Sequence, residues 1–321
     1  MKAIVQDGSG SADVLQLREI DKPVVTDGGV LVRVRAASVN ALDWHSVHGG
    51  KMIQAVSALM RQPEQPVRGV DLAGHVEAVG AGVTRFTPGD EVFGGAPAAF
   101  AEYALAREGA LVLKPQNLSF EQAAAVGVAG RTALQGLRDK AQVKPGQRVL
   151  ISGAGGGVGT FAVQIAKALG ARVTAVTSTR NLDLIRALGP DEVIDYTQED
   201  FTKRGERYDA VFDVAANRSV SDLRRVLTPT GTLVLVGADK RGGVAIFTRI
   251  GGAFVRSRLL RQRIVFYVAK ATQADLIVLK ELIEAGQLCP AIDRTYPLSE
   301  AAEAVRYVGS GQARAKVVLT M

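Results

Sequence analysis

The chain has 321 residues, of which 47% are hydrophobic and 22% are charged, so it is long enough for two domains and typical of a globular protein. No apolar run is long enough to span a bilayer, and the first ten residues lack the pattern of a signal peptide. The single cysteine, Cys289, excludes an internal disulfide and a Cys-rich metal cluster. We therefore expect a cytoplasmic protein without integral membrane association.

The net charge of +7 comes from one segment of the chain. Residues 240–263 contain seven basic residues and no acidic one, and the rest of the chain is near neutral. No nucleic acid is expected as a partner, because the charge does not form a body-wide basic coat. We interpret the segment as a solvated surface excursion or the rim of a dimer. Peripheral membrane contact is the alternative.

The first hundred residues are predicted to form a small β-barrel or sandwich. Residues 30–34 (VLVRV) alternate apolar and basic side chains, which is typical of a strand with one buried face. Turn-forming sequences stand at 26–29 and 88–90. Residues 52–60 have the apolar spacing of a helix, which would pack on the barrel or, alternatively, form a lip over substrate.

From Ser119 onward, the pattern changes to helices that alternate with strands. The sequence SFEQ at 119–122 fits a capping box before an Ala-rich helix. A parallel sheet covered by helices, and hence the α/β class, is predicted from apolar strands at 148–152, 172–177, 192–195, 209–214, 232–237 and 264–269.

Two apolar stretches are expected to pair outside the parallel sheet of one chain. The final stretch, 315–321, suits a strand of the first domain better than a finished parallel sheet. The strand at 264–269 is an apolar edge, which favours pairing with a second copy in a homodimer.

A glycine-rich loop lies between a predicted strand and a predicted helix. In residues 151–170 the pattern G-x-G-x-x-G fits best at Ala154, Gly156 and Gly159, with alanine in place of the first glycine. Such a loop lets the pyrophosphate of a dinucleotide approach the backbone at the N-terminus of the helix. The alternative is a tight strand-to-helix turn without a ligand.

The next strand indicates which dinucleotide binds. An NAD site usually has Asp or Glu at the end of this strand, but this chain has Thr-Ser-Thr-Arg at 177–180. Hydroxyls and a guanidinium suit the 2′-phosphate of NADP(H), which a carboxylate would repel. Arg180 as an ordinary solvated residue at a helix start is the alternative.

The order of parts resembles the medium-chain dehydrogenase/reductase superfamily. The resemblance rests on motifs at 39–49, 69–94, 99–103, 125–137, 153–159, 193–196, 212–214, 235–237 and 313–319. It implies a GroES-like β-barrel domain, residues 1–122 and 288–321. It also implies a Rossmann NADP-binding domain, residues 123–287.

Zinc-dependent members of this superfamily have three catalytic ligands at positions that here hold Asn40, Val70 and Val128. Valine offers no ligand atom, so no metal is expected. His45 and His48, three apart, and His75, in a predicted strand, are interpreted as structural. The resemblance is therefore to the zinc-independent quinone oxidoreductases, which include zeta-crystallin and the reticulon-interacting mitochondrial reductases.

The resemblance implies roles for individual residues. Asn40 would donate a hydrogen bond to a developing oxyanion, Asp43 would order its loop, and the proton donor is Tyr267, His45 or water. Thr132 would lie near the nicotinamide, and Ser178, Arg180 and Tyr196 around the 2′-phosphate. The residues implied for cofactor binding are Thr132, Ala154, Gly156, Gly157, Val158, Gly159, Ser178, Thr179, Arg180, Tyr196, Asp213, Gly237, Ala238, Phe266 and Lys316.

The resulting hypothesis is an NADPH-dependent, zinc-independent oxidoreductase that reduces quinones or α,β-unsaturated carbonyls. Without a Lewis acid, a conjugated acceptor that delocalises the incoming charge is the easier substrate. One alternative is an NADP-dependent alcohol or aldehyde reductase. The other is a dinucleotide-binding protein that binds RNA or a partner with little turnover.

Overall fold

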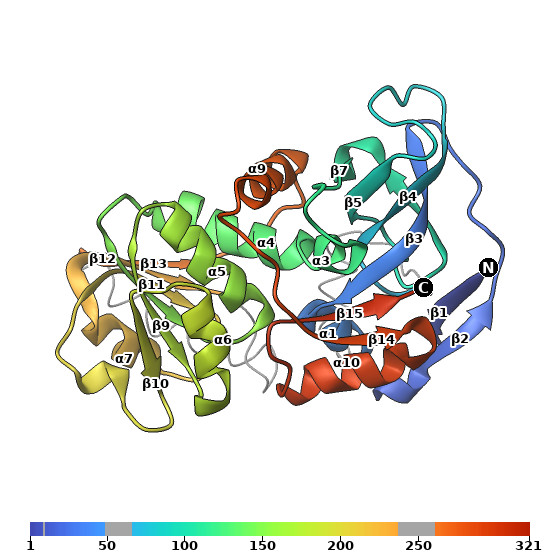
Figure 1. Cartoon of the computed structure of the whole chain (residues 1–321). Helices are drawn as coiled ribbons and strands as arrows, with labels where there is room; N and C mark the ends of the chain where they lie inside the picture. Colours follow the sequence, from blue (N-terminus) through green and yellow to red (C-terminus); the bar gives the residue numbers. More distant parts are fainter. Residues whose placement is uncertain (9, 49–65, 237–260) are drawn as a thin grey trace. The chain divides into compact units, whose positions relative to one another are not determined.

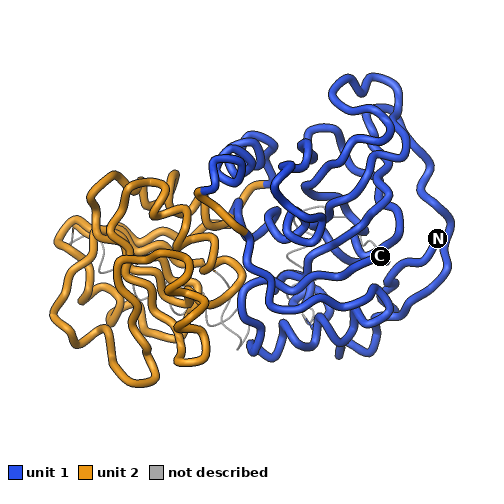
Figure 2. The backbone as a smooth tube through the Cα atoms, in the orientation of Figure 1, with its two compact units in different colours: residues 1–131, 271–286, 290–321 blue, residues 132–270, 287–289 orange. Residues whose placement is uncertain are grey.

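The computed structural model describes residues 1–8, 10–48, 66–236 and 261–321. Its contacts divide the chain into two units (Figure 2). Unit 1 comprises residues 1–131, 271–286 and 290–321, and unit 2 comprises residues 132–270 and 287–289. The helix predicted at 52–60, the candidate residues Gly237 and Ala238, and most of the basic segment lie outside the described residues.

Unit 1 is built on β-sheets, as the sequence predicted. The larger sheet has the order β14 (Ile292–Pro297), β15 (Lys316–Thr320), β3 (Gly29–Val39), β4 (Asp71–Val79), β5 (Glu91–Gly95) and β7 (Leu111–Leu113), and β6 (Tyr103–Arg107) also pairs with β3. A two-stranded sheet joins β1 (Lys2–Gln6) and β2 (Leu15–Glu19). The alternating residues 30–34 lie within β3, with Val32 buried and Arg33 exposed.

The C-terminal strand joins this sheet. Strand β15 pairs antiparallel with β3, so that Val317 lies opposite Val39, and parallel with β14. The prediction that the tail returns to the first domain is confirmed. This pairing also brings Lys316 next to the end of β3, which the site description uses below.

The helices of unit 1 lie around these sheets (Figure 1). Helix α3 begins with the predicted capping box, in which Ser119 Oγ accepts from Gln122 N. Helix α4 continues into a π-helical segment, η3 (Gln135–Ala141), that ends at Gln142. The helices are α1 (Ala41–His48), α3 (Phe120–Ala124), α4 (Gly127–Leu134), which continues past residue 131 into unit 2, α9 (Gln273–Glu284) and α10 (Ala301–Ser310), with short turns η1 (Ala12–Val14), η2 (Glu108–Ala110) and η6 (Leu298–Glu300).

Unit 2 is a parallel six-stranded sheet. Its order is β10 (Glu192–Asp195), β9 (Arg172–Thr177), β8 (Arg148–Ser152), β11 (Tyr208–Asp213), β12 (Leu227–Leu235) and β13 (Arg263–Phe266). Every neighbouring pair is parallel. In chain order this is 3-2-1-4-5-6, the strand order of the Rossmann fold, so the α/β prediction is confirmed.

Helices cover this sheet and connect its strands. Helix α5 (Gly157–Ala168) packs on β8 and β9, α6 (Leu182–Ala187) on β9 and β10, and α7 (Val220–Arg225) on β12. The turns η4 (Thr179–Asn181) and η5 (Phe201–Lys203) lie in two of the connections. Because the strands are parallel, their carboxyl ends all meet at one edge, which therefore collects the loops that follow β8, β9, β10 and β11.

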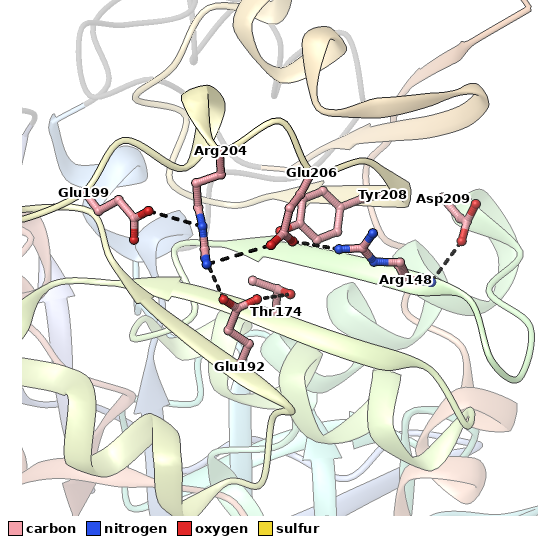
Figure 3. Close-up of polar contacts among 8 residues, drawn as sticks. All are labelled: Arg148, Thr174, Glu192, Glu199, Arg204, Glu206, Tyr208 and Asp209. Carbon is pink, nitrogen blue, oxygen red and sulfur yellow. Dashed lines mark hydrogen bonds and ion pairs between the residues drawn. The ribbon is translucent and has the colours of Figure 1, made fainter.

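Ion pairs join the strands at the opposite edge of this sheet (Figure 3). Arg204 contacts Glu192, Glu199 and Glu206, at 2.6, 3.2 and 3.8 Å. Glu206 also accepts from Arg148, the first residue of β8. The hydrogen bond that Arg204 donates to Glu192, foremost, and the nearby carboxylates raise the pKa of Arg204. The network connects the amino ends of the strands. It therefore stabilises the sheet and lies apart from the loops at the carboxyl ends.

The two units do not coincide with the predicted domain boundaries. The contacts assign residues 123–131 and 271–286 to unit 1. Gly130 approaches Leu279 so closely that a Cβ on the glycine would lie 3.0 Å from the leucine side chain, and Val128 N donates to Asp71. The boundaries at 122 and 288 stay a prediction about domains.

Candidate active site

The glycine loop connects β8 to α5. Gly153 adopts φ +84°, a left-handed conformation that favours glycine. The N–H groups of Gly153 and Ala154 donate to Val176 O, at 3.2 and 3.0 Å, which fixes the loop to β9. Ala154 is fully buried, so its side chain faces the core and only its backbone shapes the loop. Gly156 is the N-cap of α5.

The loop leaves room for an anion at the start of α5. Gly157, Val158 and Gly159 form the first turn, in which backbone N–H groups have no acceptor within the helix. A Cβ on Gly159 would lie 2.2 Å from Gly153 O, so this glycine allows the helix to pack on the loop. A Cβ on Gly156 would meet nothing nearer than 3.6 Å, and its φ of −91° suits any residue. The position is open, so a pyrophosphate would have room to approach the backbone here, as the sequence predicts.

The end of β9 meets a carboxylate from β10. Thr179 Oγ1 donates to Asp195 Oδ2 at 2.5 Å, and Thr197 donates to Asp195 Oδ1 from N and Oγ1, at 2.9 and 2.7 Å. These hydrogen bonds, that from Thr179 first, hold the pKa of Asp195 below its usual range. Tyr196 follows, exposed, with its N donating to Thr177 O. The motif VIDY contains Asp195, but only the pairing of Asp195 with Thr177 reveals its place.

Two further residues of this edge are already engaged within the chain. Asp213, buried at the end of β11, accepts from Ala216 N at 3.2 Å and so orders the turn after the strand. Asn181 is 6% exposed, and its Oδ1 has no hydrogen-bond partner among the described residues. A Cβ on Gly155 would lie 2.3 Å from Asn181 Nδ2, so Asn181 packs directly on the glycine loop.

Phe266 and Tyr267, at the end of β13, differ in their surroundings. Phe266 is 42% exposed, whereas the Tyr267 hydroxyl donates to Thr132 O. Burial, foremost, raises the pKa of Tyr267 well above its usual range, and Asp139 adds to this. The Tyr267 hydroxyl is therefore protonated near neutral pH and directed to Thr132 O, and its role as proton donor stays a prediction.

Unit 1 contains a buried polar cluster, formed by Ser38, Asn40, Asp43, Asp71 and Lys316. None of these residues is more than 6% exposed. Asn40 Nδ2 donates to Asp71 Oδ2 at 2.9 Å and to Ser38 O at 3.3 Å. Asn40 Oδ1 accepts from Lys316 Nζ at 2.6 Å. Both amide hydrogens of Asn40 thus have acceptors within the protein, so donation to substrate requires Asn40 to release Ser38 O.

Asp71 is the centre of the buried polar cluster. Its two oxygens accept from Val128 N at 3.0 Å each, and Oδ2 also accepts from Ser38 Oγ at 3.2 Å. A Cβ on Gly127 would lie 2.1 Å from Asp71 Oδ1, so only glycine fits there. Asn40 and Val128, at two of the positions that hold zinc ligands in zinc-dependent relatives, therefore converge on a carboxylate. Within the described ranges, no three His, Cys, Asp or Glu residues are placed to hold a metal ion.

The two other charged members of the cluster have shifted pKa values. Asp43 Oδ2 accepts from Asn40 N at 2.7 Å, so Asp43 orders the loop before α1. Burial raises the pKa of Asp43 to about 7, against that hydrogen bond. Burial lowers the pKa of Lys316, and Asp71 and Asp43 oppose this shift. Lys316, predicted to bind cofactor, is in this structure a partner of Asn40.

The three histidines contact aromatic rings. His48 stacks on Trp44 with ring centroids 4.6 Å apart, and His45 contacts the same ring edge-on at 4.9 Å. Burial lowers the pKa of His45, with a smaller effect from His48. His75 lies beside Phe120 in unit 1.

Comparisons with known proteins agree with this architecture. A family profile described as alcohol dehydrogenase GroES-like domain matches residues 26–116, and one described as zinc-binding dehydrogenase matches residues 188–319. The chain is 35% identical to the mitochondrial NAD(P)H oxidoreductase RTN4IP1 of Mus musculus, over 100% of this chain and 89% of the relative. It is 32% identical to the chloroplastic NADPH-dependent alkenal/one oxidoreductase of Arabidopsis thaliana, over 99% and 79%.

A solved structure shows the same likeness over the whole chain. The quinone oxidoreductase from Coxiella burnetii superposes with a TM-score of 0.87 and 31% identity, covering 100% of this chain and 99% of that chain. Among the residues that the structure describes, no helix has the length and apolar character needed to cross a membrane.

Replacing Gly156 by alanine is expected to weaken NADPH binding without unfolding the protein. The new methyl group would meet only Gly153 O, at 3.6 Å, so the free energy of unfolding should fall by at most about 1 kcal/mol, the scale of an N-cap change. It would displace the pyrophosphate from charged hydrogen bonds, a loss of about tenfold or more in affinity. NADPH fluorescence titration measures this. Gly109→Ala, also unobstructed, is the control, and an unchanged affinity of Gly156→Ala would contradict the site.

The free energy of unfolding is expected to fall as pH rises between 3.8 and about 7. In that range folded Asp43 still holds a proton that the unfolded carboxyl has lost, so the folded state loses its advantage as pH increases. Asp43→Asn removes this titration. At high pH only, its free energy of unfolding should exceed that of the wild type by at least about 1.4 kcal/mol, which is the energy of a shift by one pKa unit.

Urea denaturation of both proteins over a pH series measures the effect. Asp27→Asn, at an exposed turn, controls for the change in net charge. A stability difference between Asp43→Asn and wild type that is constant with pH would show that Asp43 is ionised throughout.

Proposed function

Because the chain belongs to the quinone oxidoreductase-like branch of the medium-chain dehydrogenase/reductase superfamily, we propose that it reduces quinones or α,β-unsaturated carbonyl compounds with NADPH and without zinc. The observation that carries the proposal is the glycine loop. Gly156 leaves the approach to the loop unobstructed, and it caps a helix whose first N–H groups have no acceptor within that helix.

The preference for NADPH rests on the residues after β9. Ser178 and Arg180 follow the strand end at Thr177, and a guanidinium there attracts a 2′-phosphate. The Arabidopsis thaliana relative is named as NADPH-dependent, whereas the mouse relative is named for NAD(P)H. The Ser178 and Arg180 contacts to the phosphate stay part of the proposal.

The proposed substrate class rests on the residues at the three positions where zinc-dependent relatives have their ligands. At two of the positions of zinc ligands, Val70 and Val128 offer no ligand side chain, and at the third Asn40 is bonded to Asp71 and Lys316. The side chains here therefore supply hydrogen bonds and not a Lewis acid. An acceptor whose conjugation delocalises the charge of the hydride needs less help than an isolated carbonyl. The names of the Arabidopsis thaliana and Coxiella burnetii relatives fit this class.

The residues of the chain have distinct tasks in this proposal. A bound NADPH supplies the hydride. Asn40 is held by Lys316 and Asp71, and it reaches an oxyanion only by exchanging its 3.3 Å contact with Ser38 O. Tyr267 donates to Thr132 O and would have to release it to protonate substrate, and His45 and water are the other candidate proton donors.

Location in the cytoplasm is proposed from the cysteine content alone. One cysteine in 321 residues suits a reducing compartment. The relatives named above carry the descriptions chloroplastic and mitochondrial, which concern those proteins.

A homodimer is proposed through the free edge of the unit 2 sheet. Strand β13 pairs only with β12 among the described strands, and Phe266 and Val268 at its end are 42% and 69% exposed. An exposed apolar edge strand is stabilised by a partner strand. Light scattering at micromolar concentration should give the mass of a dimer. A monomer mass would contradict this proposal.

NADPH oxidation is expected to be at least about a hundredfold faster with a quinone or an enone than with a saturated ketone or aldehyde. The factor corresponds to the several kcal/mol that a Lewis acid would otherwise supply to an isolated carbonyl. The absorbance of NADPH, followed with matched pairs such as an enone and its saturated ketone, measures the ratio. Preference for saturated aldehydes would instead favour an alcohol or aldehyde reductase, and binding without turnover would favour a dinucleotide-binding protein.

A further inference from the structure

The carboxyl end of β10 delivers a carboxylate to residues expected to recognise the adenosine 2′ position. Asp195 pairs with Thr177 across β10 and β9, and the turn η4 follows directly after β9. Thr179, the first residue of η4, donates its hydroxyl to Asp195 at 2.5 Å. The end of β9 itself has no acidic residue, so the carboxylate that many NAD sites place there comes here from the neighbouring strand.

We propose that Asp195 is a specificity-determining residue, which lowers the preference of this chain for NADPH and allows NADH to bind as well. The proposal rests on the proposed function, since it concerns the same dinucleotide. It adds a determinant that opposes Arg180 at the 2′ position.

Two physical effects give Asp195 this role. First, like charges repel: a carboxylate near a phosphate weakens phosphate binding, and the phosphate carries close to two negative charges at neutral pH. Second, the hydrogen of the Thr179 hydroxyl is committed to Asp195, so Thr179 Oγ1 can accept but not donate. Phosphate oxygens need donors, whereas the ribose 2′-hydroxyl of NADH is itself a donor and finds acceptors in both residues.

Asp195 is anionic under ordinary conditions. It accepts from Thr179 Oγ1, Thr197 N and Thr197 Oγ1, and these bonds hold its pKa below the usual range. It is therefore charged at every pH at which the two nucleotides would be compared.

The test is Asp195→Asn, which removes the charge and keeps an amide oxygen that can accept from Thr179 or Thr197. Dissociation constants for NADPH and NADH are measured by fluorescence titration of the wild type and the variant, at low and high ionic strength. The ratio of the two constants should shift toward NADPH by about thirtyfold, the effect in water of one charge on a doubly charged phosphate about 4 Å away. The shift should shrink at high ionic strength, because exposed charges are screened.

Asp191→Asn is the matched control. Asp191 directly precedes β10, at the opposite end of the same strand, and accepts from Lys167 Nζ and Val173 N. Its loss changes the net charge equally but should leave the nucleotide ratio unchanged. Thermal unfolding of each variant shows whether the folded state is retained.

Three outcomes would overturn the proposal. They are an unchanged ratio in a folded Asp195→Asn variant, an equal loss of affinity for both nucleotides in that variant, and an equal shift of the ratio in Asp191→Asn. In each of these the wild type still binds NADPH, so the proposed function stands. A wild type that binds neither nucleotide would overturn both.

Discussion

Parallel strands of one sheet place all their carboxyl ends at the same edge, and in unit 2 this alignment gathers the glycine loop, Thr179 and Asp195. The order 3-2-1-4-5-6 puts β8 beside both β9 and β11, so the loop after β8 lies between the ends of its neighbours. Gly153 and Ala154 hydrogen-bond to Val176 and hold the loop against β9. The proposed dinucleotide site therefore follows from strand order and a few loop hydrogen bonds.

In unit 1 the corresponding constraint is a buried carboxylate that needs hydrogen-bond donors. Asp71 is fully buried, and a carboxylate without water needs several donors. Ser38 and Asn40, at the end of β3, and the backbone of Val128, in α4, supply them from two segments, while Lys316 arrives on the C-terminal strand. The return of β15 to β3 thus places a cation that offsets buried negative charge. In this way the last strand of the chain completes the surroundings of Asn40.

Local patterns in the sequence predicted much of this arrangement. The capping box at Ser119, the strands of unit 2, the glycine loop and the return of the last strand were all readable, because each depends on neighbouring residues or on simple periodicity. Three features were not readable. Asp195 meets Thr179 only through the register of β10 on β9, Lys316 meets Asn40 only through β15 on β3, and Tyr267 meets Thr132 only after both elements have packed. These contacts join residues far apart in the chain, which composition and spacing do not encode.

The central claim is that a nicotinamide held by unit 2 passes its hydride to a conjugated acceptor. A single turnover with NADPH deuterated at the transferable position of the nicotinamide, followed by mass spectrometry of the product, tests it most directly. Transfer to an enone should place one deuterium on the carbon β to the carbonyl, because the hydride adds at the far end of the conjugated system. A product without deuterium, or deuterium on the carbonyl carbon, would contradict the account.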